Sequence, residues 1–119
     1  MQDRTTTIDL LQGTLGVLIL KSISWGPMHG YGIARWIEQI SGDELPIEEG
    51  SLYPALHRLQ ARGLVTSQWG VSETGRRIKT YTITEQGRQQ LRAEMTRWTR
   101  FSAAISRVLQ ARAPRAAGA

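Results

Sequence analysis

The apolar positions at the start of the chain predict two helices. Residues 7–24 are apolar on nearly every side of a helix, so more than one face of that helix must be covered. We expect it to be the central helix of the core or to be shared with a second subunit. After a Gly-Pro turn over residues 24–30, a single apolar stripe at helical spacing predicts a second helix over residues 31–40. The stripe consists of Ile33, Trp36, Ile37 and Ile40.

Residues 50–63 predict a third, short helix with a defined end. Leu52, Leu56 and Leu59 fall on one face, and Gly63 is placed to end the helix in a left-handed conformation. Polar side chains remain for the other side, namely Ser51, His57, Arg58, Gln60 and Arg62. Such a helix has the right size for a DNA major groove, but an ordinary surface helix would show the same pattern.

Two strand-like segments follow the third helix. Residues 64–70 alternate as a half-buried strand does, and residues 76–84 are rich in β-branched and aromatic side chains. Because turn-forming residues join the two segments, the sequence predicts a hairpin, and its return strand is basic. Helix, turn, helix and hairpin together make a winged helix-turn-helix. In that arrangement the basic arm would lie along the phosphate backbone or enter a minor groove.

The last apolar pattern is a heptad seam on a long helix. The helix starts after Thr84, which forms only a partial capping box because Gly87 replaces the usual Glu. The seam positions are Leu91, Met95, Trp98, Ser102, Ile105 and Leu109. Two short helices and a hairpin cannot bury so long a seam, which indicates a partner, most simply a second copy of the chain. The expected dimer interface comprises Leu10, Leu15, Leu91, Met95, Trp98, Ile105 and Leu109.

Together these patterns predict a mainly α fold with a β-hairpin, of class α+β. With 119 residues the chain is large enough for one modest core. We expect a winged helix-turn-helix DNA-binding domain over residues 7–84, a dimerisation helix over residues 85–110 and a disordered tail over residues 111–119.

Composition excludes several classes of protein. The chain is 40% hydrophobic and 21% charged, which fits a folded soluble protein. It has no cysteine, so it cannot form a disulfide, an iron–sulfur cluster or a thiolate zinc site. This is compatible with the reducing cytoplasm, where we place the protein. The apolar stretch at residues 10–23 is shorter than the roughly 20 residues that a membrane span needs.

Charge is unevenly distributed along the chain. Residues 1–57 carry three basic and seven acidic side chains, a charge of −4, whereas residues 58–119 carry twelve basic and three acidic ones, a charge of +9. A basic half that begins at the end of the third helix indicates a polyanionic partner. A charged helix and tail that only solubilise the protein would give a similar imbalance.

The inventory of reactive side chains argues against an enzyme. The only histidines are His29 and His57, and no Gly-rich phosphate loop is followed by lysine. Paired carboxylates occur only at residues 43–44 and 48–49, in a connecting segment. Because no spacing of metal ligands is present either, we expect no catalytic residue, metal or cofactor.

The order of the elements and several short motifs resemble the PadR family of transcriptional regulators. The motifs are Asp9–Leu15, His29–Ile33, Gly50–Leu59 and Gly63–Val65, followed by the basic hairpin. The resemblance covers about residues 8–109. With a single C-terminal helix the chain is similar to the short-form subfamily.

The resemblance implies a homodimer built by the first and last helices, whose recognition helices and wings bind double-stranded DNA at a roughly palindromic operator. Family members are mostly repressors, often relieved by a small molecule. Multidrug-sensing members hold flat ligands against a tryptophan of the last helix, and Trp98 matches that position. Two residues depart from the pattern: Thr80 replaces the first of two wing tyrosines, and Ser102 supplies no acid for a cationic drug.

The expected DNA contacts come from the third helix and the wing, namely Ser51, Tyr53, Arg58, Arg76, Arg77 and Lys79. Arg58 could pair with a guanine edge, although phosphate contact is the commoner role. Tyr53 could instead pack against the first helix, and His57 is expected to be a structural surface residue. Trp98 could be a ligand platform or dimer core. The other tryptophans are expected in the core or at its edge: Trp25, Trp36 and Trp69.

We therefore expect a sequence-specific, DNA-binding transcriptional regulator that acts as a repressor and responds to a small hydrophobic effector. Two alternatives remain open. One is a winged helix used for protein–protein contact, in which the basic half binds an acidic partner. The other is an architectural DNA-binding protein that responds to no effector.

Overall fold

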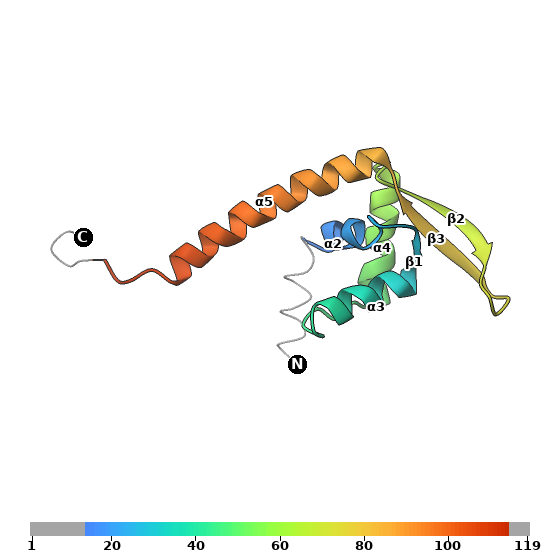
Figure 1. The fold of residues 1–119 in the computed structure, drawn as a ribbon, viewed down its shortest axis with the longest axis horizontal. Coiled ribbons are helices and arrows are strands. Elements are labelled where there is room, and N and C mark those ends of the chain that lie inside the picture. Colours follow the sequence, from blue (N-terminus) through green and yellow to red (C-terminus); the bar gives the residue numbers. More distant parts are fainter. Residues whose placement is uncertain (1–13, 115–119) are drawn as a thin grey trace.

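The computed structural model describes residues 14–114, which form a winged helix with a long C-terminal helix. Figure 1 shows the hairpin projecting from one side of the helical body and the last helix from the other. In chain order the elements are α2 (Leu15–Ser22), β1 (Met28–His29), α3 (Gly30–Ile40), α4 (Glu49–Ala61), β2 (Val65–Val71), β3 (Arg77–Ile83) and α5 (Glu85–Leu109). Leu10 and the start of the first predicted helix lie outside the described residues.

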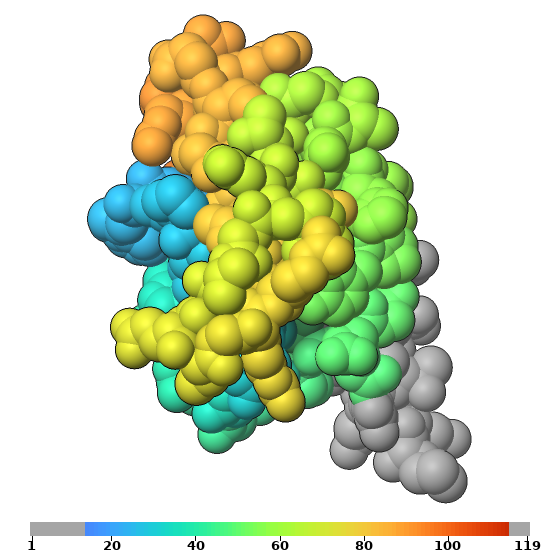
Figure 2. All heavy atoms as spheres, turned by 90° about the vertical axis from the view of Figure 1, so that its right-hand side faces the viewer, coloured from blue at the N-terminus to red at the C-terminus, as the bar shows by residue number. Residues whose placement is uncertain are grey.

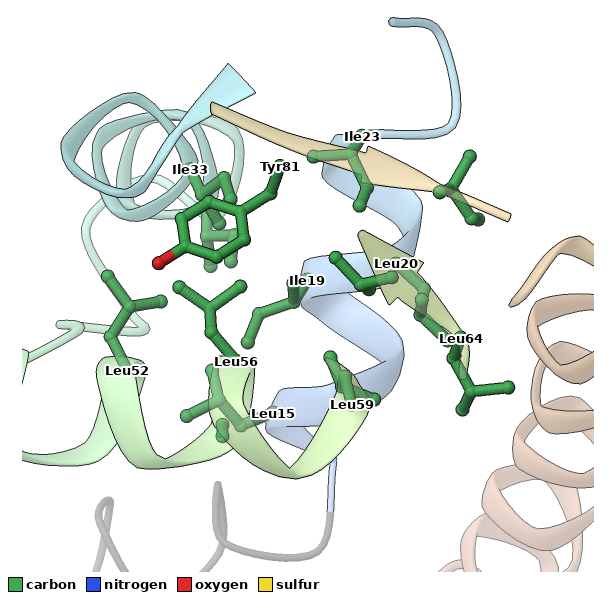
Figure 3. Close-up of a cluster of buried hydrophobic side chains, with 14 of the residues drawn as sticks. Leu15, Ile19, Leu20, Ile23, Ile33, Leu52, Leu56, Leu59, Leu64 and Tyr81 are labelled. Carbon is green, nitrogen blue, oxygen red and sulfur yellow. The ribbon is translucent and has the colours of Figure 1, made fainter. Parts of the chain in front are cut away.

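Helix α2 lies at the centre of the core, as its apolar pattern predicts. Ile19 and Leu20 are fully buried, and the helix contacts α3, α4 and α5. Figure 3 shows Leu56 of α4 and Tyr81 of β3 among the side chains that surround it. Each aliphatic side chain buried in this way stabilises the fold by about 1.5–3 kcal/mol.

The sheet has three antiparallel strands in the order β1-β3-β2. The hairpin of β2 and β3 was predicted, but β1 lies within the segment that was expected to form a turn. Met28 pairs with Tyr81 and His29 pairs with Thr80. The segment that leads into α3 runs along the free edge of β3. The backbone groups at a free strand edge are unpaired, so they form hydrogen bonds with an extended segment that lies beside them.

Two of the tryptophans lie outside the core, one on the hairpin and one in a turn. Residues of β2 and β3 that face the helices are buried near the body, where Val65 pairs with Ile83, but the hairpin continues beyond the helices. Trp69 lies on this outer part and is 55% exposed. Trp25, in the turn before β1, is 69% exposed, and its ring centroid lies 5.5 Å from that of Trp36. Trp36, which was expected in the core or at its edge, is partly buried against the core.

Helix α5 begins where the sequence predicts. The N–H of Gly87 donates to Oγ1 of Thr84 over 2.9 Å, which satisfies one of the free amides of the first turn. Glycine replaces the usual glutamate at this point because a Cβ at residue 87 would lie 2.2 Å from the carbonyl oxygen of Leu64. Leu91 is the last buried residue of α5, and the far part of the helix projects from the body (Figure 1).

Two further expectations concern the C-terminal tail and membrane-spanning helices. Residues 111–114 form no helix or strand, and the remainder of the predicted tail lies outside the described residues. Among residues 14–114, none of the helices combines the length and the apolar character that crossing a membrane requires.

Candidate nucleic-acid interface

Helix α4 is held in place by one buried face and by a defined end. Leu52, Leu56 and Leu59 are buried in the core, as predicted. At the end of the helix Gly63 has φ of +77°, and its N–H donates a hydrogen bond to the carbonyl of Gln60. The N–H of Leu64 donates to the carbonyl of Leu59, which completes a Schellman motif. The prediction of a left-handed end at Gly63 is confirmed.

Tyr53 packs against a different element from the one expected. Its ring lies over the start of α3, where a Cβ built on Gly30 would be 2.7 Å from the phenolic oxygen. Burial raises the pKa of the Tyr81 phenol, and the nearby Tyr53 raises it further. With 36% of its surface exposed, Tyr53 is both a packing residue and a residue that a ligand of α4 can touch.

The middle of the exposed face of α4 is formed by residues that were not among the predicted DNA contacts. At about 100° per residue, the positions opposite the buried leucines are Gly50, Pro54, His57 and Ala61, and all four are exposed. Of these only His57 has a polar side chain, although it was expected to be a structural surface residue. A helical projection of the buried leucines would have placed it at the centre. Ser51 and Arg58, seven residues apart, share one flank of this surface, and Tyr53 lies on the other.

Helix α4 contains a proline. The helix begins at Glu49, so Pro54 falls in its second turn. Proline has no N–H to donate to the carbonyl of Gly50. Both residues are exposed, so water can satisfy that carbonyl.

The wing brings together two of its three predicted basic residues. Arg77 and Lys79 alternate onto the same face of β3, where the guanidinium carbon of Arg77 lies 4.5 Å and Nζ of Lys79 lies 5.7 Å from the centroid of the Trp69 ring. Arg76 precedes β3 and belongs to the turn, where its N–H donates to Oγ of Ser72 over 3.1 Å. Arg77 and Lys79 are thus the two basic residues of the wing that lie over the Trp69 ring.

Helix α4 and the wing occupy adjacent surfaces of the molecule. Strand β2 contacts α4, and Figure 2 shows α4 beside the hairpin when the molecule is viewed from the end of the wing. A long, anionic partner that meets α4 therefore lies close to the hairpin as well.

The predicted dimer residues divide into two groups. Leu15 and Leu91 are buried in the core of their own chain, so they offer almost no surface to a second copy. Their place in the predicted interface is corrected accordingly, because α2 and the first turns of α5 already cover one another. The seam residues farther along α5 are exposed, namely Met95, Trp98, Ile105 and Leu109.

An open groove of about 1410 Å³ runs along the exposed part of α5. Its apolar lining includes Val17, Leu18, Leu45, Trp98, Phe101 and Ile105. The rings of Trp98 and Phe101 lie 6.4 Å apart, and Trp98 is 52% exposed. Arg97 and Arg100 also line the groove, and Arg97 forms an ion pair with Glu94. The groove thus combines aromatic surface with an excess of positive charge.

Comparison with known proteins assigns the chain to a family. Residues 19–93 match the transcriptional regulator PadR-like family. The chain belongs to this family. A transcriptional regulator from Clostridium thermocellum has the same fold, with a TM-score of 0.76 at 28% identity over 83% of this chain and 96% of that one. A PadR-like transcriptional regulator from Bacillus cereus gives a TM-score of 0.75 at 30% identity over 87% of this chain and 99% of that one.

One curated relative is longer than the PadR-like chain. An uncharacterized 37.1 kDa protein in transposon TN4556 of Streptomyces fradiae is 39% identical over 89 residues. The match covers 75% of this chain but 24% of that protein, so the chain spans about a quarter of the relative's length. The predicted family and the α+β winged-helix fold are confirmed, and membership implies DNA-binding regulation of transcription.

Proposed function

We propose that this PadR-like protein is a cytoplasmic, homodimeric repressor that binds a roughly palindromic operator in double-stranded DNA. The observation that carries the proposal is the placement of α4 beside the hairpin, whose return strand carries Arg77 and Lys79. In this arrangement α4 enters a major groove, where His57 and Arg58 meet base edges, and the wing contacts the neighbouring backbone. Phosphate contacts set the position, and base contacts set the sequence preference.

The experiment compares two duplexes under one condition. The full chain is titrated into a labelled duplex from its own promoter and into a shuffled duplex of the same composition, at moderate salt, with fluorescence anisotropy as the measurement. A sequence-specific regulator binds the promoter duplex at least about 1000-fold more tightly. Equal affinity for both duplexes would favour an architectural DNA-binding protein, and no binding to either would favour a protein-interaction module.

Repression requires a second measurement. A reporter gene placed behind the same promoter should give less transcript when the chain is expressed. A rise in transcript would identify an activator.

We further propose that the groove beside Trp98 binds a flat, uncharged or anionic aromatic effector, which relieves repression. Aromatic surface from Trp98 and Phe101 suits a planar ligand, and the arginines of the groove disfavour a cation. This reasoning agrees with Ser102, which supplies no acid.

The prediction for Trp98 uses 8-anilinonaphthalene-1-sulfonate as an anionic aromatic probe. Its binding should quench tryptophan fluorescence in the wild type, and Trp98→Ala should lower the affinity by about ten-fold through lost ring contact. Trp25→Ala removes an exposed tryptophan outside the groove and is the matched control. If Trp98→Ala instead separates the subunits, Trp98 is part of the dimer core.

A further inference from the structure

The wing carries an exposed aromatic ring with two cations over it. Trp69 on β2 pairs with Lys79 on β3, and the side chains of Lys79 and Arg77 both lie over its ring. Neither cation forms an ion pair with a carboxylate among residues 14–114. More than half of the Trp69 surface is nevertheless exposed. The chain thus presents a flat apolar surface and two unneutralised charges on one face of the hairpin.

The core of the protein does not explain this tryptophan. Trp69 lies on the same face of the hairpin as Val65 and Tyr81, which are buried, but it lies farther out, where no helix covers the strands. A smaller polar residue would suit a solvated position better, because the exposed half of the indole gains nothing from burial in the free protein. Stacking with an exposed cation contributes only about 0.5–1 kcal/mol.

The composition of the cluster matches the backbone of DNA. Along each strand, anionic phosphates alternate with deoxyribose rings, whose faces are largely apolar. Lysine and arginine bind the phosphates, and an apolar side chain can pack on the sugar between them. An acidic protein surface would pair with the two cations but would leave the indole without an apolar partner.

We propose that Trp69 is a DNA-contacting residue of the wing, which packs on a deoxyribose while Arg77 and Lys79 bind the adjacent phosphates. This inference rests on the proposed function, because it requires that the chain bind duplex DNA. Trp69 contributes affinity for DNA that does not depend on salt concentration, whereas the contribution of Arg77 and Lys79 does depend on it.

The test measures affinity for the promoter duplex at several salt concentrations. Trp69→Ala should lower the affinity by about ten-fold, because the variant no longer buries an indole ring against the DNA. The slope of log affinity against log salt should stay unchanged, because the substitution removes no charge. Trp69→Phe should keep most of the affinity. Arg77→Gln and Lys79→Gln should each reduce the slope by about 0.9.

A matched control lies in the same chain. Trp25 is also exposed and also has a cation over its ring, with Nζ of Lys21 at 4.6 Å, but it lies in the turn before β1 and not on the wing. Trp25→Ala should leave DNA affinity unchanged. Thermal unfolding of each variant checks that the fold is intact. Because the substituted side chains are exposed, we expect the unfolding temperature to remain close to that of the wild type.

Fluorescence gives a second, independent readout. Acrylamide quenching is measured for the wild type and for Trp69→Phe, with and without the duplex, and the difference reports Trp69. DNA should protect Trp69 from the quencher. Wild-type affinity in Trp69→Ala or an unprotected Trp69 would overturn the inference while leaving the proposed function in place. Failure of the wild type to bind any duplex would overturn both.

Discussion

At the scale of single residues, the close contacts of this chain depend on glycine. Gly87 allows the first turn of α5 to approach the carbonyl of Leu64, and Gly30 allows the ring of Tyr53 to rest on the start of α3. Both contacts join segments that are distant in the sequence. The sequence shows a glycine at each position, but it does not show which atoms the absent side chain leaves room for.

Gly87→Ala should destabilise the fold by about 1–3 kcal/mol, because the added methyl group forces the backbone of α5 away from Leu64. The free energy of unfolding in urea, followed by circular dichroism, is the measurement. Gly50→Ala is the matched control, since Gly50 is also helical but a Cβ there meets nothing within 4 Å. In that variant alanine should stabilise α4 by about 0.5–1 kcal/mol. Equal effects of the two substitutions would contradict the close contact at Gly87.

At the scale of elements, the wing shows how one alternating pattern can have two environments. Val65 and Trp69 share a face of β2, yet the first is buried and the second is exposed. Alternation assigns side chains to a face of a strand, but it does not say where the covering helices end. The strand β1 was missed for a related reason, since a two-residue strand has no pattern of its own and exists only because β3 is beside it.

Strand β3 also makes the stability of the fold sensitive to alkaline pH. Burial, and then the neighbouring Tyr53, raise the pKa of Tyr81 above its usual value of 10.0. The folded chain therefore holds the phenolic proton more tightly than the unfolded chain does. The stabilisation is fully present below about pH 10, and it is lost as the pH rises further, because the unfolded state is the first to lose its proton.

Tyr81→Phe should remove this part of the alkaline loss. The free energy of unfolding, measured in urea from about pH 8 to pH 11.5, should fall less steeply above pH 10 in the variant than in the wild type. Tyr31→Phe, which changes an exposed tyrosine of α3, should behave like the wild type. An alkaline loss of the same size in Tyr81→Phe would show that another group is responsible.

At the scale of the whole molecule, α5 decides how the protein is used. Its first turns are covered by α2, but the exposed seam beyond them has no covering element among the described residues. A second copy of the chain would cover these apolar side chains and would hold two α4 helices at a fixed separation. The predicted division into a DNA-binding domain and a dimerisation helix follows from this proposal.

Ile105→Glu should convert a dimer into monomers, because it places a charge within the apolar groove. Sedimentation velocity at micromolar concentration should give twice the chain mass for the wild type and the chain mass for the variant. Affinity for the promoter duplex should fall by about 100-fold or more, since each half-site is then bound alone. Ser106→Glu adds the same charge to α5 outside the lining of the groove and should remain dimeric. A monomeric wild type would contradict the proposed assembly.

The sequence by itself determined the order and type of the long elements, the end of α4 at Gly63, the cap of α5 and the family, because each of these depends on local spacing or on a contiguous motif. The tertiary structure alone decided which residues of a given face are covered. It buried Leu15 and Leu91 within the chain and left Trp69 in solvent beside Arg77. Periodicity defines directions around a helix or strand, whereas burial depends on what another segment places against that surface.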